Sequence, residues 1–183
     1  TPSPTKEEET KTVSNIEEGT EASLTFFTTA IYKVVVKAAK NISILEVSIR
    51  EQIEKPNVTS PPGTAYKYLI VNSTLQREDA EYVDLYFKVS NSWMRWKNVS
   101  SDMMTLCRYE GRWETLPTTL VSNDTAYTYY KARAPNLSVF AITAQSKFEI
   151  PILTILIAGI VGCVAILAII LIRMPGFRLL LAR

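Results

Sequence analysis

The stretch Tyr82-Val83-Asp84-Leu85-Tyr86-Phe87-Lys88-Val89-Ser90 decides the fold, because apolar and polar side chains alternate along it. The odd-numbered residues from 83 to 89 are all apolar, and the even-numbered residues from 82 to 90 are aromatic, charged or polar. Successive side chains of a β-strand point to opposite faces. The pattern therefore predicts a strand with one buried and one solvated face.

Eight further segments show similar patterns and are separated by turn residues such as Glu110-Gly111 and Pro61-Pro62-Gly63. No segment has a convincing amphipathic helix pattern. Nine short strands at this spacing predict an all-β fold, an antiparallel β-sandwich of immunoglobulin-like type over residues 21–147. The eight segments are Ser23–Thr28, Tyr32–Ala38, Ile44–Ile49, Tyr66–Val71, Met104–Tyr109, Arg112–Leu116, Ala126–Ala132 and Ser138–Thr143.

The aromatic residues, which include three Trp and nine Tyr, are expected to pack in the core and between strands. A ligand platform is the alternative. Two segments are candidate contact surfaces: Tyr32–Val36, interpreted as a sheet edge, and the corner Trp93–Trp96. Exposure of Trp93 and Trp96 favours a recognition role, and burial of both favours a structural one.

Residues 1–20 combine Pro, Thr, Ser and Glu, with Val13 and Ile16 as the sizeable apolar side chains. Such a segment buries too little surface to offset its chain entropy, which predicts a flexible Thr/Glu/Pro-rich spacer or a frayed terminus. Thr1 is followed by no signal peptide, although an outward-facing domain needs one. We therefore expect that this chain derives from a longer precursor.

The segment Ile150–Ile172 is apolar at 19 of its 23 positions. A helix of that length reaches about 34 Å, enough to cross a hydrocarbon core of about 30 Å. This predicts a transmembrane α-helix over residues 148–173 and a short basic cytoplasmic tail over residues 174–183. Because Arg173, Arg178 and Arg183 flank the span, the amino-terminal domain is expected outside the cell.

Ala158 and Gly162 lie four residues apart within this span. Small residues at that interval let two helices approach closely, so a homo-oligomer is one alternative. The apolar segment Ile150–Ile172 contains no charged residue, and so nothing suggests an ion path.

Six of the eight Asn residues lie in Asn-x-Ser/Thr acceptors. Chance occurrence in a Ser/Thr-rich chain is the alternative to N-linked glycosylation of an exported domain. We predict that all six carry glycans: Asn41, Asn57, Asn72, Asn98, Asn123 and Asn136.

Cys107 lies in the outer part of the chain and Cys163 in the predicted span, so the two cannot pair. Cys107 is predicted to be a buried strand residue, with an intermolecular disulfide as the alternative. Small vertebrate ectodomains usually carry a disulfide framework. Dense sequons without one favour an archaeal envelope protein.

The chain has no His and no Gly-rich phosphate loop, which removes the commonest general base and metal ligand. The acidic residues Glu78, Asp79, Glu81 and Asp84 match no calcium-loop spacing and are interpreted as a solvated face. We predict no enzymatic activity, no cofactor and no metal. The sequence also shows no basic patch that would bind nucleic acid.

The stretch from Trp93 to Ile142 resembles the PGF-pre-PGF domain of archaeal surface proteins. The resemblance rests on Ser92-Trp93, Leu106, Arg108-Tyr109, Trp113, Leu116, Thr118 and the ending Tyr130–Ile142. It implies an envelope module near the carboxyl end of a larger surface protein. Two departures are Pro135-Asn136-Leu137 in place of Pro-Gly-Phe, and Pro175-Gly176-Phe177 placed after the span instead of before it. We expect the helix to be retained as an anchor.

The sequence therefore predicts a membrane-anchored, N-glycosylated cell-surface structural protein that tethers an S-layer-like or other envelope assembly. Its expected partners are the lipid bilayer, N-linked glycans, other envelope or S-layer proteins and an upstream part of the same precursor. The alternatives are an adhesin or receptor-like recognition ectodomain and an accessory subunit of a membrane complex.

Overall fold

The computed structural model describes residues 8–52 and 55–145, which form eleven strands, one short α-helix and two 3-10 turns. The helix is α1 (Asn91–Lys97), and the turns are η1 (Arg77–Asp79) and η2 (Ser101–Met103). The strands are β1 (Glu8–Ile16), β2 (Glu21–Thr25), β3 (Ile31–Ala38), β4 (Ile42–Gln52), β5 (Thr64–Ser73), β6 (Ala80–Ser90), β7 (Met104–Glu110), β8 (Arg112–Leu116), β9 (Thr118–Asn123), β10 (Tyr127–Ala134) and β11 (Val139–Ala144).

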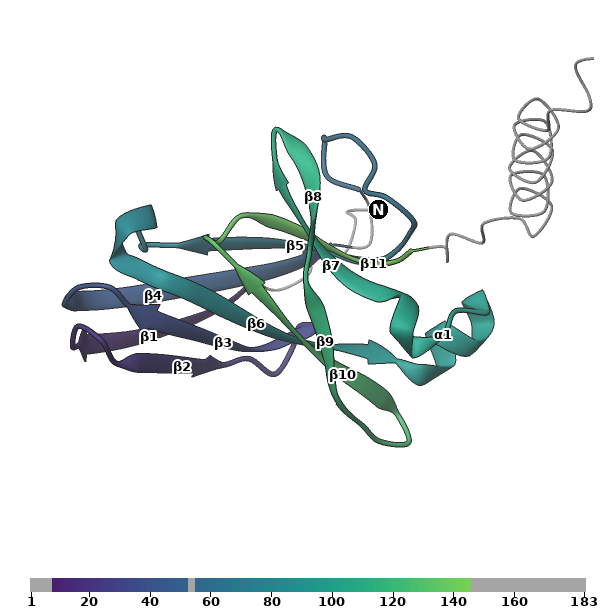
Figure 1. Cartoon of the computed structure of the whole chain (residues 1–183), viewed down its shortest axis with the longest axis horizontal. Coiled ribbons are helices and arrows are strands. Elements are labelled where there is room, and N and C mark those ends of the chain that lie inside the picture. The colour runs from purple at the N-terminus through teal and green to yellow at the C-terminus, as the bar shows by residue number, and fades with distance from the viewer. Residues whose placement is uncertain (1–7, 53–54, 146–183) are drawn as a thin grey trace, which may run out of the picture. The chain divides into compact units, whose positions relative to one another are not determined.

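The strands form two antiparallel sheets that pack face to face (Figure 1). The six-stranded sheet has the order β1-β4-β5-β11-β7-β8, and the five-stranded sheet has the order β2-β3-β6-β10-β9. This confirms the prediction of a mostly β, sandwich-like fold. Each of the nine predicted segments overlaps one of the strands.

The alternating strand β6 lies in the middle of the five-stranded sheet, and its apolar side forms part of the core. Val83, Leu85, Phe87 and Val89 are all 0% exposed. Phe87 stacks on Tyr130 of β10 with 5.2 Å between ring centroids. Full burial of a side chain of this size stabilises the fold by about 1.5–3 kcal/mol. The inner face of β6 is therefore a main source of stability.

A second, smaller apolar cluster lies on the outer face of the six-stranded sheet. It contains Cys107 and Ala141, both 0% exposed, with Trp113 packed against them. The Trp113 Nε1–H donates to the Thr59 carbonyl oxygen at 2.7 Å, which ties the segment between β4 and β5 to this cluster. The prediction that Cys107 is a buried strand residue is confirmed.

The predicted spacer is wrong for residues 8–16, which form β1. This strand pairs with β4 from Glu8↔Arg50 to Ile16↔Ile42. Ile16 is only 6% exposed, and Val13 packs against the core. Pairing with a central strand satisfies backbone groups and covers alternate side chains, so a segment of low apolar content is still ordered. Residues 1–7 lie outside the described residues.

The helix α1 and the strand β9 also differ from the prediction. The seven-residue α1 is too short to show a helical period, and local capping defines it: Ser90 Oγ accepts from the Trp93 N–H at 3.5 Å, and Asn98 ends the helix at φ 52°. Its only buried residue is Met94. In β9 the residues are largely exposed and do not alternate, because the strand lies at the sheet edge.

No helix among residues 8–52 and 55–145 is long and apolar enough to span a membrane. The predicted span over 148–173, its packing residues Ala158 and Gly162, and the tail over 174–183 all lie outside the described residues.

Gly63 offers a test of the contact between the start of β5 and the end of β11. At φ 79° its Cβ would lie 2.2 Å from the Ala144 carbonyl oxygen. We expect Gly63→Ala to lower the free energy of unfolding by about 2–4 kcal/mol, because overpacking adds to the left-handed backbone cost. Urea unfolding in mild detergent, followed by tryptophan fluorescence, measures this change.

Gly111→Ala is the control. Gly111 has φ 72° but nothing within 4 Å, so a loss of about 1 kcal/mol in the free energy of unfolding is expected. Equal losses would contradict the packing argument.

Candidate functional site

The outer face of the five-stranded sheet carries an unusual group of tyrosine and basic side chains. They come from β3, β6 and β10, which are neighbours in the sheet. Register pairs place them side by side, as in Lys33↔Tyr86, Lys131↔Tyr86 and Tyr129↔Lys88. We refer to these residues as the tyrosine–lysine face: Tyr32, Lys33, Lys37, Tyr82, Asp84, Tyr86, Lys88, Tyr127, Tyr129, Lys131 and Arg133.

The tyrosine rings of this face contact one another. Tyr32 meets Tyr129 edge-on with centroids 5.5 Å apart, and it meets Tyr86 at 6.2 Å. Tyr127 lies 6.5 Å from Tyr129. Edge-to-face pairs at these separations are favourable because the positive ring edge meets the negative ring face. Four of the five rings, those of Tyr32, Tyr86, Tyr127 and Tyr129, therefore form one connected layer across three strands.

Basic groups lie over the faces of these rings. The Lys33 ammonium is 3.8 Å from the Tyr86 centroid, and the Arg133 guanidinium is 3.6 Å from the Tyr82 centroid. The Lys88 ammonium lies 5.1 Å from the centroid of Tyr127. Such cation–π contacts hold the charges near the sheet.

Asp84 is the buried acid of this face, at 3% exposure. Its two carboxylate oxygens accept from Arg133 Nε at 2.7 Å and Nη2 at 2.9 Å, and Lys131 Nζ lies 2.7 Å away. Burial raises the pKa of Asp84, but hydrogen bonds from Arg133 and Lys131 outweigh it, and the pKa is lowered overall. The carboxylate therefore stays ionised and orders two cations.

The tyrosine–lysine face is positively charged, although the described residues as a whole are not. Residues 8–52 and 55–145 contain 15 basic and 15 acidic residues, so their net charge is zero. The face has five basic groups against Asp84 and, at its edges, Glu21 and Asp124, which accept from the hydroxyls of Tyr82 and Tyr129, both at 2.7 Å. The difference, five minus three, is +2 and leaves −2 for the remaining described residues. Charge is therefore segregated.

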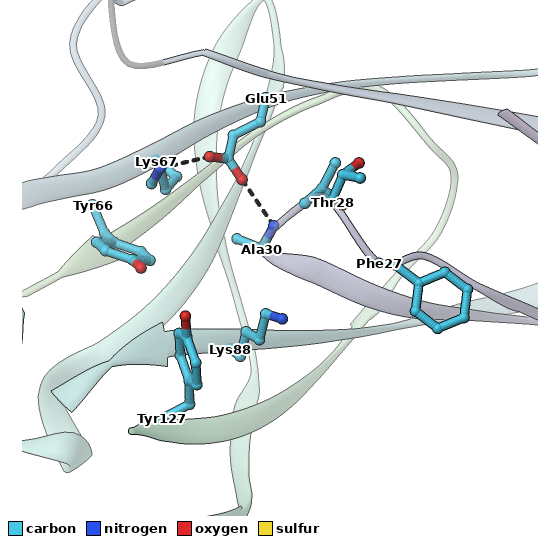
Figure 2. Close-up of a pocket in the computed structure, with 9 residues that line it drawn as sticks. Phe27, Thr28, Ala30, Glu51, Tyr66, Lys67, Lys88 and Tyr127 are labelled. Carbon is cyan, nitrogen blue, oxygen red and sulfur yellow. Dashed lines mark hydrogen bonds and ion pairs between the residues drawn. The ribbon is translucent and has the colours of Figure 1, made fainter. Parts of the chain in front are cut away.

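A hollow of about 210 Å³ adjoins this face, and Lys88 and Tyr127 belong to both (Figure 2). It lies where the turn between β2 and β3 meets the end of β4, the start of β5 and the adjoining ends of β6 and β10. Its lining residues are mainly polar or aromatic: Phe27, Thr28, Thr29, Ala30, Glu51, Tyr66, Lys67, Lys88 and Tyr127.

Two carboxylates hold the wall of the hollow. Glu51, at 5% exposure, accepts from the Ala30 N–H at 2.8 Å and from Lys67 Nζ at 2.5 Å (Figure 2). Glu9 Oε2 accepts from the N–H groups of Phe27 and Thr28, both at 2.9 Å. Burial by itself raises the pKa of Glu9. The hydrogen bonds outweigh this effect, and the pKa is lowered from the ordinary 4.5 to about 2. The turn between β2 and β3 is thus fixed by side chains from the opposite sheet.

Lys88 is the basic group of the hollow without a carboxylate partner. Within the described chain no Asp or Glu oxygen lies at ion-pair distance from its ammonium, whereas Lys67 is paired with Glu51. Its contact is the ring of Tyr127. The hollow can therefore accept a negatively charged group.

Five of the six predicted glycosylation sites are exposed, and they lie in loops or at element ends: Asn41, Asn57, Asn72, Asn98 and Asn123. Asn136 is half-buried, and its Oδ1 accepts from Nε of the buried Arg108 at 3.0 Å. Exposure fits glycosylation at the first five sites. Asn136 has a packing role in addition.

The predicted contact surfaces differ in outcome. Tyr32–Val36 is not a sheet edge, because β3 lies between β2 and β6. Trp93 is half-buried against Tyr66, with centroids 4.8 Å apart, while Trp96 is 74% exposed beside Lys97. Because one tryptophan is half-buried and the other is exposed, their exposure favours neither the recognition role nor the structural role.

The prediction that the dense acidic segment forms a solvated face is wrong for Asp84, which is 3% exposed, whereas Glu78 and Glu81 are exposed. Asp79 pairs with Lys40 at 2.8 Å, whereas Asp84 points to Arg133 on the tyrosine–lysine face. In the part of the chain that the structure describes, no group of three or more His, Cys, Asp or Glu could hold a metal ion.

The tyrosine–lysine face was missed from sequence, although a signal exists. Tyr82, Tyr86 and Lys88 all have even numbers and so lie on one side of their strand, and Tyr127 and Tyr129 likewise share one side of theirs.

No protein-family model matches the chain, and a search of curated proteins finds no significant match.

Glu9→Gln tests the carboxylate that holds the turn between β2 and β3. We expect the free energy of unfolding at pH 7 to fall by about 1–2 kcal/mol, because a charged acceptor of three hydrogen bonds is lost. The folded pKa is about 2, below the ordinary 4.5. The carboxylate's contribution is therefore present above pH 4.5 and lost as the pH falls toward 2. Urea unfolding in mild detergent between pH 7 and pH 3 should show a flatter pH dependence for the variant. Glu8→Gln, at an exposed neighbour, is the control; identical slopes would refute the role of Glu9.

Asp84→Asn tests the buried acid of the tyrosine–lysine face. We expect a loss of about 2 kcal/mol, because Lys131 and Arg133 would then lie together without their counter-charge. The value is below that of a fully buried pair, since the side chains of Lys131 and Arg133 are 35% and 54% exposed. Chemical denaturation at pH 7 gives the measurement, and Glu81→Gln, exposed on the same strand, is the control. Equal stability of the two variants would show that Asp84 is not needed.

Proposed function

We propose that this protein is a membrane-anchored, N-glycosylated structural protein of the archaeal cell surface, which tethers an S-layer-like or other envelope assembly. The observation that carries the proposal is the order of parts: a β-domain, then a 23-residue apolar segment, then three arginines. Only four residues separate Gln145, the last described residue, from Ile150. The domain is thus attached directly to the proposed anchor.

The position of β11 supports a tethering role. This strand is the last of the domain, and it lies inside the six-stranded sheet, paired with both β5 and β7. A pull along the strand loads two rows of backbone hydrogen bonds together instead of opening them one at a time. Tension from the membrane side would therefore meet resistance from the whole sheet.

The exposed sequons support the extracellular location. Glycans on five exposed Asn side chains would surround the β-domain with hydrated polymer without disturbing its core. In this proposal the domain is immunoglobulin-like, the residues from 148 to 173 form a single transmembrane helix, and the tail lies in the cytoplasm. The partners are lipids, other envelope proteins and an upstream part of the same precursor.

A recognition ectodomain is the second candidate, and one observation favours it. The tyrosine–lysine face has a net charge of +2 and adjoins a hollow, as a ligand-binding surface would. The two functions are compatible when the ligand is itself part of the envelope.

Expression in a glycosylating archaeal host tests the anchor. We expect the wild type to remain in membranes after carbonate extraction, and Leu156→Arg/Ile160→Arg to be released, because charges in a span are costly. Arg178→Lys in the tail is the control and should stay in the membrane. Extraction of the wild type would refute the anchor.

Two further measurements on the same cells test the other parts of the proposal. Peptide mass spectrometry should find glycans at the exposed sequons, and unmodified Asn at all of them would refute glycosylation. Cryo-tomography of native envelopes should place the protein in a regular surface array. A sparse, irregular distribution would favour the recognition role.

A further inference from the structure

We infer that the tyrosine–lysine face, together with the adjoining hollow, binds an acidic polysaccharide whose sugars carry carboxylate or sulfate groups. The inference deepens the proposed function, on which it rests for its cell-surface setting, by naming the envelope component that the domain holds. Three features support it: the charge of the face, the geometry of its side chains and the hollow beside it.

Charge complementarity is the first argument. Five basic groups share the face with the carboxylates of Asp84, Glu21 and Asp124, which leaves a net charge of +2, while the rest of the described domain is negative by the same amount. Such segregation attracts a polyanion to this face and repels it from the others. Because the domain as a whole is neutral, attraction would be local and sensitive to salt.

The basic groups of the tyrosine–lysine face are already ordered without a ligand. Lys33 and Arg133 lie over tyrosine rings, and Lys131 and Arg133 are held by Asp84. A lysine that is restrained before binding loses less side-chain entropy when a ligand arrives. The face is thus organised before any ligand binds.

Tyrosine hydroxyls supply the neutral contacts that a sugar needs. Among the described residues, the hydroxyl groups of Tyr32 and Tyr127 have no hydrogen-bond partner, whereas Tyr129 donates to Asp124 and Tyr82 to Glu21. Two hydroxyl groups therefore remain to bond with sugar hydroxyls, beside ring edges that can pack against the sugar ring.

The hollow provides an end site for one sugar unit. Its volume of about 210 Å³ leaves room for polar groups of a terminal sugar. Lys88 has no carboxylate partner there and can receive the acidic group of that sugar. Because Lys88 and Tyr127 also belong to the face, the polymer can continue from the hollow across β6 and β10.

A protein partner fits this face less well. Protein interfaces have an apolar centre that excludes water. None of the large exposed apolar residues of the described chain is among the face residues, and only Phe27 lines the hollow: they are Phe27, Ile44, Trp96, Leu120 and Val121. The face offers charge and hydroxyl groups, which match a hydrated acidic glycan.

The experiment uses the full chain in nanodiscs and measures binding to polygalacturonate, chondroitin sulfate and neutral dextran by biolayer interferometry. We expect both acidic polymers to bind at 50 mM NaCl, more weakly at 300 mM, and dextran not to bind. Lys33→Gln/Lys88→Gln should weaken binding about tenfold, because two charged contacts are lost. Lys55→Gln/Lys97→Gln, which removes the same charge from exposed lysines off the face, is the matched control and should bind like the wild type.

Three outcomes would overturn the inference. The first is binding of dextran as strong as that of the acidic polymers, and the second is an equal loss of binding in the two double variants. The third is self-association of the chain that Lys33→Gln/Lys88→Gln abolishes, because this would assign the face to a second copy. Equal unfolding midpoints of the variants show that loss of binding is not loss of fold. Carbonate extraction reports separately on the anchor, so polymer binding by a chain that leaves the membrane would refute the proposed anchor alone.

Discussion

Strand β6 must bury one side and expose the other, and much of the structure depends on this constraint. Its odd-numbered residues from Val83 to Val89 are fully buried in the core between the sheets. Because side chains alternate strictly, its even-numbered residues, from Tyr82 to Lys88, are fixed on the outer face. A shift of register by one residue would exchange the two sets and place Asp84 in the apolar core. The same strand therefore determines both the stability of the domain and the position of the candidate site.

The end of the sandwich near the hollow is held by a different kind of interaction. Between β2 and β3 the chain leaves the sheet ladder, and its N–H groups are satisfied by carboxylates of Glu9 and Glu51. Both acids come from strands of the six-stranded sheet, so they join the two sheets where the apolar core ends. The polar hollow lies at this junction.

The two proposed roles of the domain use different parts of it. Strand β11, inside the six-stranded sheet, would transmit tension toward the anchor, while the tyrosine–lysine face belongs to the five-stranded sheet. A load on one sheet can thus be separated from binding on the other. Gly63, packed against the Ala144 carbonyl, joins the start of β5 to the end of β11. Close backbone contact at that point reinforces β11, the described strand that comes last before the proposed anchor in the sequence.

Prediction from sequence succeeded where a strand's own residues carry the pattern. The period-two pattern located the central strands, and Cys107 was correctly placed inside. Prediction failed for β1, which is ordered because it pairs with β4. It also failed for α1, which depends on a cap and one buried methionine. At β9 the edge position leaves both sides exposed, so no alternation marks the strand.

The candidate site shows the same division more sharply. The sequence by itself determined the alternation of tyrosine and lysine along β6 and β10, and hence which side chains share a face within each strand. Only the tertiary structure decided that β3 and β10 lie on either side of β6, since strand order depends on contacts between residues far apart in the chain. The hollow, with a Lys88 that has no carboxylate partner in the described part of the chain, likewise arises where five separate segments meet. No local pattern encodes such a meeting, because its energy depends on how the two sheets pack.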